Sequence, residues 1–413
     1  MRLISIAVLS AMLAPVCASV AVAQPLSFDT ALNLALHNAP SLQASAAGVT
    51  AAKSAAVAAG RLPDPKLRFG VENFPVSGPP AGSFSADSMT MASVGITQDM
   101  PNGDKRKAER QKAAADIDIA SANAAVETRD VRLNTALAWV DLYYARKKLT
   151  ALDGALQAIT SIGATAPAQL AAGTIRPAQA LEADQLNAEL SDRRADLVSD
   201  VARGRAELVR WTGDDAADVA GDPPDLAVNA SNLRANLDHN PSLLPYGAKT
   251  QRAEADVAMA LADKHPDWGW DVAYEHRDPR WGDMVSGGVS ISLPLFQRTR
   301  QDPVIDAKAE EATKAHLDQD AAHRQLQAQL DADLADHVMH HDRMTRAMTT
   351  LVPLAERKVQ LETASYAAAT AILSDVQQAQ LALAEARIDA LSREADVVRD
   401  GVRINFIYGG DEQ

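Results

Sequence analysis

Large apolar side chains alternate with small or polar ones along four short segments, residues 66–71, 92–97, 268–275 and 288–293. The alternating apolar residues are Leu67, Phe69, Val71, Ala92, Val94, Ile96, Trp268, Trp270, Val272, Tyr274, Val289, Ile291 and Leu293. A period of two over such lengths predicts β-strands with one apolar face. Because a loop rich in Gly, Pro and Asp separates the members of each pair, we predict two β-hairpins, at about 66–98 and 268–293.

Very long helical patterns follow each hairpin. Residues 104–160 contain no proline and a single glycine, Gly154, and a helical pattern resumes over 178–211. After the second hairpin, helical patterns cover residues 306–350 and about 353–403. A helix of about 55 residues would be roughly 80 Å long, which exceeds a globular core. Such helices need partners along their length, as in a coiled coil.

The two halves of the chain repeat one another. An alanine-rich helical stretch begins at HNAPS, residues 37–41, and its counterpart begins at HNPS, residues 239–242. Further along, LAAGT at residues 170–174 aligns with YAAAT at residues 366–370, 196 positions later. Internal duplication accounts for both matches. We therefore predict a first repeat over residues 24–220 and a second over residues 221–413.

The N-terminal segment, residues 1–23, has the pattern of a secretory signal peptide. Arg2 precedes a short apolar run, and Ala21-Val22-Ala23 supplies a small-x-small cleavage site. The single cysteine, Cys17, falls inside this segment, so the mature chain is expected to have no disulfide and no thiolate metal site. Beyond residue 23 no stretch of 18 apolar residues exists, which excludes a membrane-spanning helix but not short, alternating barrel strands.

Composition and charge reduce the number of function classes that fit the chain. The chain is 47% apolar but 4% aromatic, with Ala and Leu supplying most of the apolar count, which is typical of long helices. A net charge of −14 argues against nucleic-acid binding. The sequence has no glycine-rich phosphate loop, nucleophile elbow or cysteine-based metal motif, so nothing favours an enzyme.

The aromatic residues concentrate at the predicted hairpins. Eight of the 17 aromatics fall in the hairpins or immediately beside them, with Trp281 and Phe296 placed as in an interfacial belt. Four strands cannot close a membrane barrel, and an open sheet edge in lipid is prohibitive. We therefore expect several chains to share one barrel. The alternative, a soluble β-sandwich face, leaves the long helices unexplained.

The order of helices, hairpins and long helices resembles the TolC family of outer-membrane efflux ducts. The resemblance spans the mature chain and includes the Asn–Pro–Ser starts and the Tyr366-x-x-x-Thr370 pattern followed by Asp375. Within the family the chain is most similar to the metal-efflux branch. That nearer likeness lies in PDP at 63–65, VENF at 71–74 and TQ at 97–98 leading to GDKR at 103–106.

This resemblance implies a mainly α fold with a transmembrane β-barrel portion. Each chain would supply a duplicated long-helix coiled-coil tunnel and two hairpins, and a homotrimer would share the barrel. The expected location is the outer membrane of a Gram-negative bacterium, in contact with lipid and with a large periplasmic part. The expected partners are a periplasmic adaptor (a membrane fusion protein) and an inner-membrane RND pump. No cofactor, nucleic acid or catalysis is expected.

The expected function is a passive duct for export to the exterior, with heavy-metal cations as cargo. A drug-efflux or type I secretion duct is the alternative within the family. A periplasmic coiled-coil scaffold without a channel is the alternative from another class, and it predicts a water-soluble protein.

The resemblance also places a periplasmic gate just after the helix tips. The tip positions expected to contact the adaptor are Gly173, Thr174, Ala369 and Thr370, and those expected to line the gate are Tyr366, Gln179, Glu182, Asp375 and Gln378. The offset of 196 pairs Gln179 with Asp375 and Glu182 with Gln378, so each repeat keeps one carboxylate on the same helix face. We expect Asp375 and Glu182 to attract cations. Glu182 as one more solvated helix carboxylate is the alternative.

A histidine cluster is the one candidate metal site. His337 and His341 lie four residues apart on a predicted helix, a spacing that can hold a divalent metal. No glutamate follows His337, so the pattern is not that of a zinc protease. Exposed helix positions would explain these residues equally well.

Overall fold

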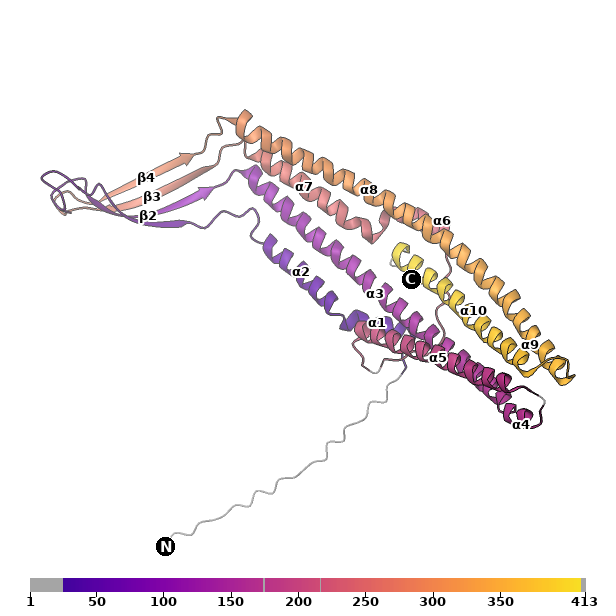
Figure 1. The fold of residues 1–413 in the computed structure, drawn as a ribbon. Coiled ribbons are helices and arrows are strands. Elements are labelled where there is room, and N and C mark those ends of the chain that lie inside the picture. The colour runs from indigo at the N-terminus through magenta and orange to yellow at the C-terminus, as the bar shows by residue number, and fades with distance from the viewer. Residues whose placement is uncertain (1–24, 174, 216, 410–413) are drawn as a thin grey trace, which may run out of the picture.

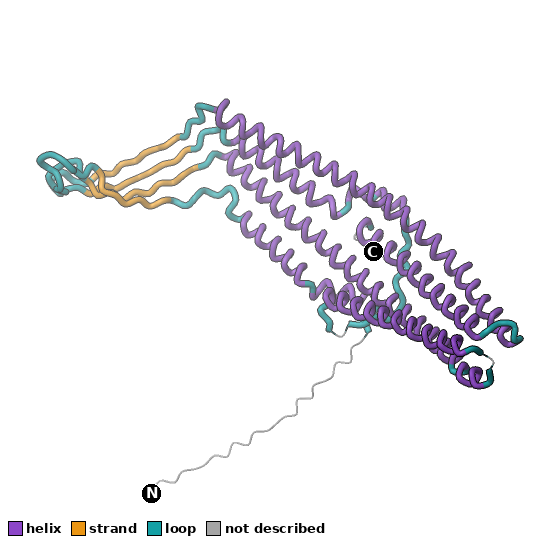
Figure 2. The backbone as a smooth tube through the Cα atoms, in the orientation of Figure 1, coloured by secondary structure: helices purple, strands orange, loops and turns teal. Residues whose placement is uncertain are grey.

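A computed structural model describes residues 25–173, 175–215 and 217–409 of the protein. It is elongated, with a small sheet at one end and long helices that run from the sheet to two helix tips at the other end (Figure 1). The tube view shows that strands and helices are segregated along this axis (Figure 2). The predicted signal peptide, residues 1–23, and Thr174 lie outside the described residues.

The two hairpins form one antiparallel sheet in the order β1-β2-β3-β4. The strands are β1 (Lys66–Glu72), β2 (Met91–Met100), β3 (Trp268–His276) and β4 (Met284–Ile291). The predicted hairpins are thus confirmed, and β2 joins β3 although they come from different halves of the chain. Strands β1 and β4 are the two edges of this sheet.

The first half of the chain forms helices α1 (Phe28–Asn38), α2 (Pro40–Ala56), α3 (Gly103–Gly163), α4 (Ala166–Ala171) and α5 (Pro177–Thr212). Their ends follow local chemistry. The Asn102 side chain caps α3 by accepting a hydrogen bond from the Lys105 N–H at 2.8 Å. Helix α2 has Pro40 at its first position, where the missing N–H costs nothing. Gly213, with a φ of 69°, ends α5.

The second half forms α6 (Ala230–Ala235), the 3-10 turns η1 (Leu237–His239) and η2 (Pro241–Leu243), α7 (Leu244–Ala262) and α8 (Gln297–Arg346). A π-helical turn, η3 (Ala347–Leu351), leads into α9 (Val352–Ala367), and α10 (Leu373–Tyr408) returns. The continuous helical pattern predicted over about 353–403 is therefore wrong, because the chain turns at residues 368–372. Ala369 makes this turn with a φ of 57°, a conformation that alanine does not signal in a sequence. Among the described helices, none is long and apolar enough to cross a membrane.

The HNAPS sequence of the first half and the HNPS sequence of the second half make equivalent hydrogen bonds. The Asn38 side chain donates a hydrogen bond to the carbonyl of Thr212, the last residue of α5, at 2.8 Å. The Asn240 side chain donates to the carbonyl of Ile407, at the end of α10, at 2.7 Å. Both asparagines thus satisfy a carbonyl that a helix end leaves without an intrahelical partner.

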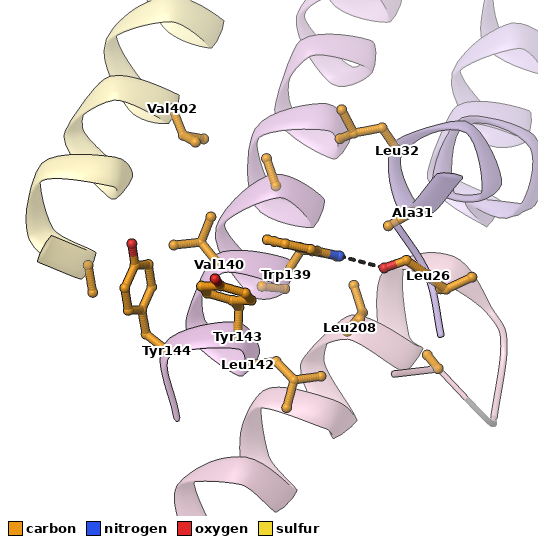
Figure 3. Close-up of a cluster of buried hydrophobic side chains, with 14 residues drawn as sticks. Leu26, Ala31, Leu32, Trp139, Val140, Leu142, Tyr143, Tyr144, Leu208 and Val402 are labelled. Carbon is orange, nitrogen blue, oxygen red and sulfur yellow. Dashed lines mark hydrogen bonds between the residues drawn. The ribbon is translucent and has the colours of Figure 1, made fainter. Parts of the chain in front are cut away.

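The principal core lies where α1, α3, α5 and α10 meet (Figure 3). Trp139 of α3 is fully buried, stacks on Tyr143 with ring centroids 5.3 Å apart, and meets Phe28 edge-on at 5.6 Å. Its indole N–H donates to the Leu26 carbonyl at 2.9 Å. This single side chain therefore fixes the start of the described chain against the middle of α3.

Candidate functional site

One face of the sheet is a continuous apolar surface. Register places Phe69 opposite Val94, Val94 opposite Tyr274, and Tyr274 opposite Val285. The exposed apolar side chains of this face are Leu67, Phe69, Val71, Val94, Ile96, Trp268, Val272, Tyr274, Val285, Val289 and Ile291. An exposed apolar patch built from all strands of a sheet marks a surface that contacts another apolar phase or partner.

The opposite face of the same sheet is polar and built largely from small residues. Its small side chains, from alternate positions of all four strands, are Gly70, Ser93, Gly95, Thr97, Gly269, Ala273, Ser286, Gly288 and Ser290. Its charged groups include Lys66, paired with Asp99 at 2.6 Å, and Glu275, which accepts a hydrogen bond from Ser286 at 2.8 Å. Small side chains leave room beside this face, and the polar groups keep that room hydrophilic.

The two aromatic residues predicted to flank the second hairpin lie at its opposite ends. Trp281 is in the β3–β4 loop and Phe296 follows β4, immediately before α8. Both side chains are exposed. This placement fits aromatic anchoring at the two borders of an apolar layer.

A polar cluster that the sequence did not reveal joins the sheet to the helices. Asp267, just before β3, accepts hydrogen bonds from the backbone N–H of Asn102 at 2.8 Å and from its side-chain amide at 2.9 Å. Lys105 adds an ion pair at 3.1 Å. Partial burial acts to raise the pKa of Asp267, but these contacts outweigh it and hold the pKa below its ordinary value. The cluster fixes how β3 leaves the helical part.

The predicted gate residues Gln179 and Asp375 occupy equivalent places in the two halves. The Gln179 side chain accepts from the Arg176 N–H at 2.9 Å at the start of α5, and Asp375 accepts from the Ile372 N–H at 3.0 Å at the start of α10. Each side chain thus satisfies a backbone donor at a helix N-terminus, where the negative charge of Asp375 is also favoured.

The remaining gate residues divide into two groups. Glu182 of α5 and Gln378 of α10 line one groove between these helices, whereas Asp375 is not among its lining residues. Tyr366 lies at the end of α9, and its hydroxyl contacts the Gln169 side chain of α4, which ties the two helix tips together.

The predicted adaptor-contacting positions lie at these tips. Gly173 has a φ of 69°, and Ala369, its counterpart at the offset of 196, has a φ of 57°. The Thr370 hydroxyl donates to the Ser365 carbonyl at 3.0 Å and closes the second turn. Thr174 is outside the described residues. The roles of all these residues in gating and docking stay predictions.

The structure brings two histidines of the cluster toward Asp400 of α10, a contact that the sequence spacing did not indicate. His340 Nδ1 lies 2.7 Å from Asp400 Oδ2 of α10, and His337 Nδ1 lies 4.0 Å from the same oxygen, while His341 is exposed. Burial lowers the pKa of His337, against the opposing pull of Asp400. In the described part of the chain, no group of three or more His, Cys, Asp or Glu side chains is placed to hold a metal ion. The proposed pairing of His337 with His341 stays a prediction.

The profile of the outer membrane efflux protein family matches residues 31–214 and 232–410. The chain belongs to this family. The resemblance to TolC-type ducts is thereby confirmed, and the family consists of efflux channels rather than enzymes.

Individual members of the outer membrane efflux family add detail. The cobalt-zinc-cadmium resistance protein CzcC of Cupriavidus metallidurans is 23% identical over 396 residues, covering 94% of this chain and 91% of that protein. The outer membrane protein VceC of Vibrio cholerae has a TM-score of 0.76 at 18% identity, covering 94% of this chain and 97% of VceC. CusC has a TM-score of 0.74 at 15% identity, covering 93% and 92%. These likenesses confirm the predicted fold class and the resemblance to the metal-efflux branch.

Proposed function

We propose that this protein is the outer membrane channel of a tripartite RND-type efflux system and conducts heavy-metal cations to the exterior. The observation that carries the proposal is the sheet, which has an apolar face, a small and polar face, and two edges, β1 and β4. Membrane barrels need at least about eight strands. Three copies would supply twelve, with β1 of each copy pairing with β4 of the next, so that no edge remains in lipid.

The two faces of the sheet indicate which side of such a barrel would meet lipid and which side would meet water. The apolar face would contact outer-membrane lipid, and the face of glycine, serine and charged groups would line the passage. The helices then extend into the periplasm, after export by the signal peptide. Their tips, around Gly173 and Ala369, would meet the periplasmic adaptor that links the duct to an inner-membrane pump. The duct is passive and needs no cofactor.

The cargo is supported by similarity and by charge. CzcC is named for cobalt, zinc and cadmium resistance, and this chain covers nearly all of it. The net charge of −14 favours cations in a conduit. Near the tips, Glu182 and Asp375 would supply carboxylates to the entrance, beside Gln179, Gln378 and Tyr366.

Neighbouring substitutions on opposite faces of β2 test the channel. Ile96→Lys places a charge on the apolar face and is expected to cost about 2–4 kcal/mol per chain in a membrane, abolishing heat-modifiable trimers in purified outer membranes. Thr97→Lys adds the same charge to the polar face and should leave trimers and planar-bilayer conductance intact. A wild-type protein that stays in the water-soluble fraction and forms no pore would instead support the coiled-coil scaffold.

Sensitivity of a deletion strain tests the cargo. Loss of the protein should sensitise cells to cobalt, zinc or cadmium, and restoring the gene should reverse this. Sensitivity to drugs without sensitivity to these metals would favour the drug-efflux alternative and contradict metal export.

A further inference from the structure

The junction between the sheet and the helices is basic, although the chain as a whole is acidic. At this end of the helical part lie the end of α2, the start of α3, the end of α7 and the start of α8, and these helices pack side by side in that order (Figure 1). Residues 57–65, 101–112, 261–267 and 292–301 form the junction, and they contain nine lysines and arginines against five aspartates and glutamates. The junction therefore carries positive charge in a protein whose net charge is −14.

Some of these basic side chains are neutralised within the chain. Lys105 pairs with Asp263 at 2.7 Å, and Lys264 pairs with Asp302 at 2.7 Å. Four others are exposed, and their side chains make no hydrogen bond or ion pair with any residue that the structure describes. This set, which we call the basic collar, consists of Arg61, Lys107, Arg298 and Arg300. In the same described segments a single carboxylate, Asp64, is likewise exposed and unpaired, so the collar keeps a surplus of positive charge.

Two collar residues lie where a helix disfavours a cation. Arg298 and Arg300 fall in the first turn of α8, which begins at Gln297 and has neither an acidic residue in that turn nor a side-chain cap. The N-terminus of a helix carries partial positive charge, so a cation there is unfavourable and an anion is favourable. The first turn of α8 therefore presents positive charge that its own residues do not offset.

The basic collar borders exposed apolar side chains. Leu293, Leu295 and Phe296, between β4 and α8, are all more than half exposed, and Leu62 beside Arg61 is exposed as well. Lysine and arginine can lay their methylene stems along apolar surface while the charged end reaches a polar layer. Apolar side chains that end in unpaired cations match the border between lipid tails and anionic headgroups.

We propose that the basic collar binds the phosphate groups of anionic phospholipids in the inner leaflet of the outer membrane. The inference rests on the proposed function, because the collar faces the periplasmic side only if the sheet forms the barrel. Arginine and lysine bind phosphate oxygens through charge-assisted hydrogen bonds. Three copies would carry the collar around the whole barrel and hold the channel at a fixed depth. Lipopolysaccharide also carries phosphates, but it belongs to the opposite leaflet.

Lipid retention tests the collar on the full-length protein. Wild type purified in detergent with equal amounts of phosphatidylglycerol and phosphatidylcholine should retain phosphatidylglycerol preferentially, as read by native mass spectrometry. Arg61→Gln/Lys107→Gln/Arg298→Gln/Arg300→Gln should lower this preference by at least about fivefold, the factor that one basic residue contributes near an anionic surface. Equal preference in the variant and the wild type would overturn the proposal.

The matched control removes the same charges further along the helices. Arg324→Gln/Arg343→Gln/Arg346→Gln/Lys358→Gln takes three arginines and one lysine from α8 and α9, at exposed side chains without an ion pair in the described part of the chain. This control should retain phosphatidylglycerol as the wild type does. A loss as large as that of the collar variant would show that total charge, rather than the collar, sets the preference, and would contradict the proposal.

A conservative variant and added salt identify the interaction as electrostatic. Arg61→Lys/Arg298→Lys/Arg300→Lys keeps every charge and should keep most of the preference. The preference should shrink between about 0.1 M and about 1 M salt, because the screening length falls from about 10 Å to about 3 Å. A preference that is lost in the lysine variant, or that does not respond to salt, would contradict binding by charge.

The remaining outcomes separate the collar from the channel. A collar variant that loses lipopolysaccharide but keeps phosphatidylglycerol would place the collar in the outer leaflet and overturn the proposal. A wild type that conducts in planar bilayers but retains both phospholipids equally would refute the collar and leave the channel standing. A water-soluble wild type that forms no pore would refute the channel, and the inner-leaflet site with it.

Discussion

Helices α3 and α8 each follow one of the two hairpins, but they pack against different sets of helices. Helix α3 packs against α1, α2, α5, α7 and α10, and it buries Trp139, Tyr143 and Tyr144 within a turn and a half. Helix α8 packs mainly against α7 and α10, and its buried residues are Ala312, Leu326, Leu330 and Leu334. The two halves therefore share an architecture, but the larger buried core lies around α3, and a smaller cluster that includes Leu326, Leu330 and Leu334 lies along α8.

The difference extends to the outer surface of the second half. Helices α8 and α9 expose large apolar side chains at Val304, Leu317, Val338, Leu354 and Leu361. In the proposed trimer a neighbouring copy would cover part of this surface. We conclude that α3 makes the most extensive contacts within the single chain, and we propose that neighbouring copies contribute more to the packing of α8.

The two helices also differ in the charges that tie them to their neighbours. Cross-helix pairs on α3 use lysine and arginine, as in Lys112 with Asp256 at 2.7 Å. On α8, Asp331 pairs with Arg234 and Asp302 with Lys264. Three histidines of α8 add further pairs: His316 lies 3.2 Å from Glu254, His323 2.7 Å from Asp238 and His340 2.7 Å from Asp400.

The largest expected effect comes from the principal core around α3. Trp139→Ala should lower the free energy of unfolding by about 3–5 kcal/mol, since it empties a fully buried site and frees the Leu26 carbonyl. Leu330→Ala, at the fully buried position of α8, should cost less, about 2–3 kcal/mol. Denaturant unfolding followed by circular dichroism measures both. An equal or larger loss for Leu330→Ala would contradict the larger contribution of the core around α3.

The matched asparagines should show the opposite ranking on a smaller scale. Asn240 is 3% exposed, and Asn240→Ala leaves the Ile407 carbonyl without its partner at a cost of about 1–3 kcal/mol. Asn38 is exposed, so water can replace its bond to Thr212, and Asn38→Ala should cost under about 1 kcal/mol. Melting temperatures of the two variants give the ranking. Equal losses would show that burial of the asparagine does not determine how much stability its replacement costs.

The smallest expected effect is a loss of stability at acidic pH. Burial lowers the pKa of His337 below its unfolded value, so its contribution to stability is complete above about pH 6.5 and is lost as the pH falls below that value. The titratable groups that face it are Asp400, which opposes the shift, and His340 and His341, which add to it.

Comparing a His337 variant with the wild type isolates the contribution of His337 to stability. Between about pH 7 and pH 5 the melting temperature of His337→Gln should fall less than that of the wild type. The exposed neighbour His341→Gln is the control and should follow the wild type. Parallel pH profiles for all three proteins would show that His337 is not the acid-sensitive group.

The fold was largely predictable because its signals are local. Period-two alternation located all four strands, and the absence of proline located α3. The helical pattern ran through the turn between α9 and α10 because Ala369 adopts a conformation that usually requires glycine, as Gly173 supplies in the first half. Only the family resemblance placed a helix tip there. Helix α8 begins at Gln297, earlier than predicted, because Pro303 is accommodated within its early turns.

The candidate site was predictable only where the repeat supplied a second copy. The offset of 196 aligns Gln179 with Asp375, and each side chain accepts a backbone N–H at the start of its helix, while their part in a gate stays a prediction. The cluster of Asn102, Lys105 and Asp267 joins residues about 165 positions apart, so no local pattern announces it. Likewise, His337 shares its neighbour Asp400 with His340 across two helices, whereas sequence spacing pointed to His341.

The edges of the sheet have a consequence for the rate of folding. Strands β1 and β4 each present backbone groups that only another strand can pair. If that strand belongs to another chain, the helices can form at any dilution, but completion of the sheet is a collision between molecules. The yield of finished channel then depends on how many chains arrive at the membrane together, and an exposed edge that waits too long is open to aggregation.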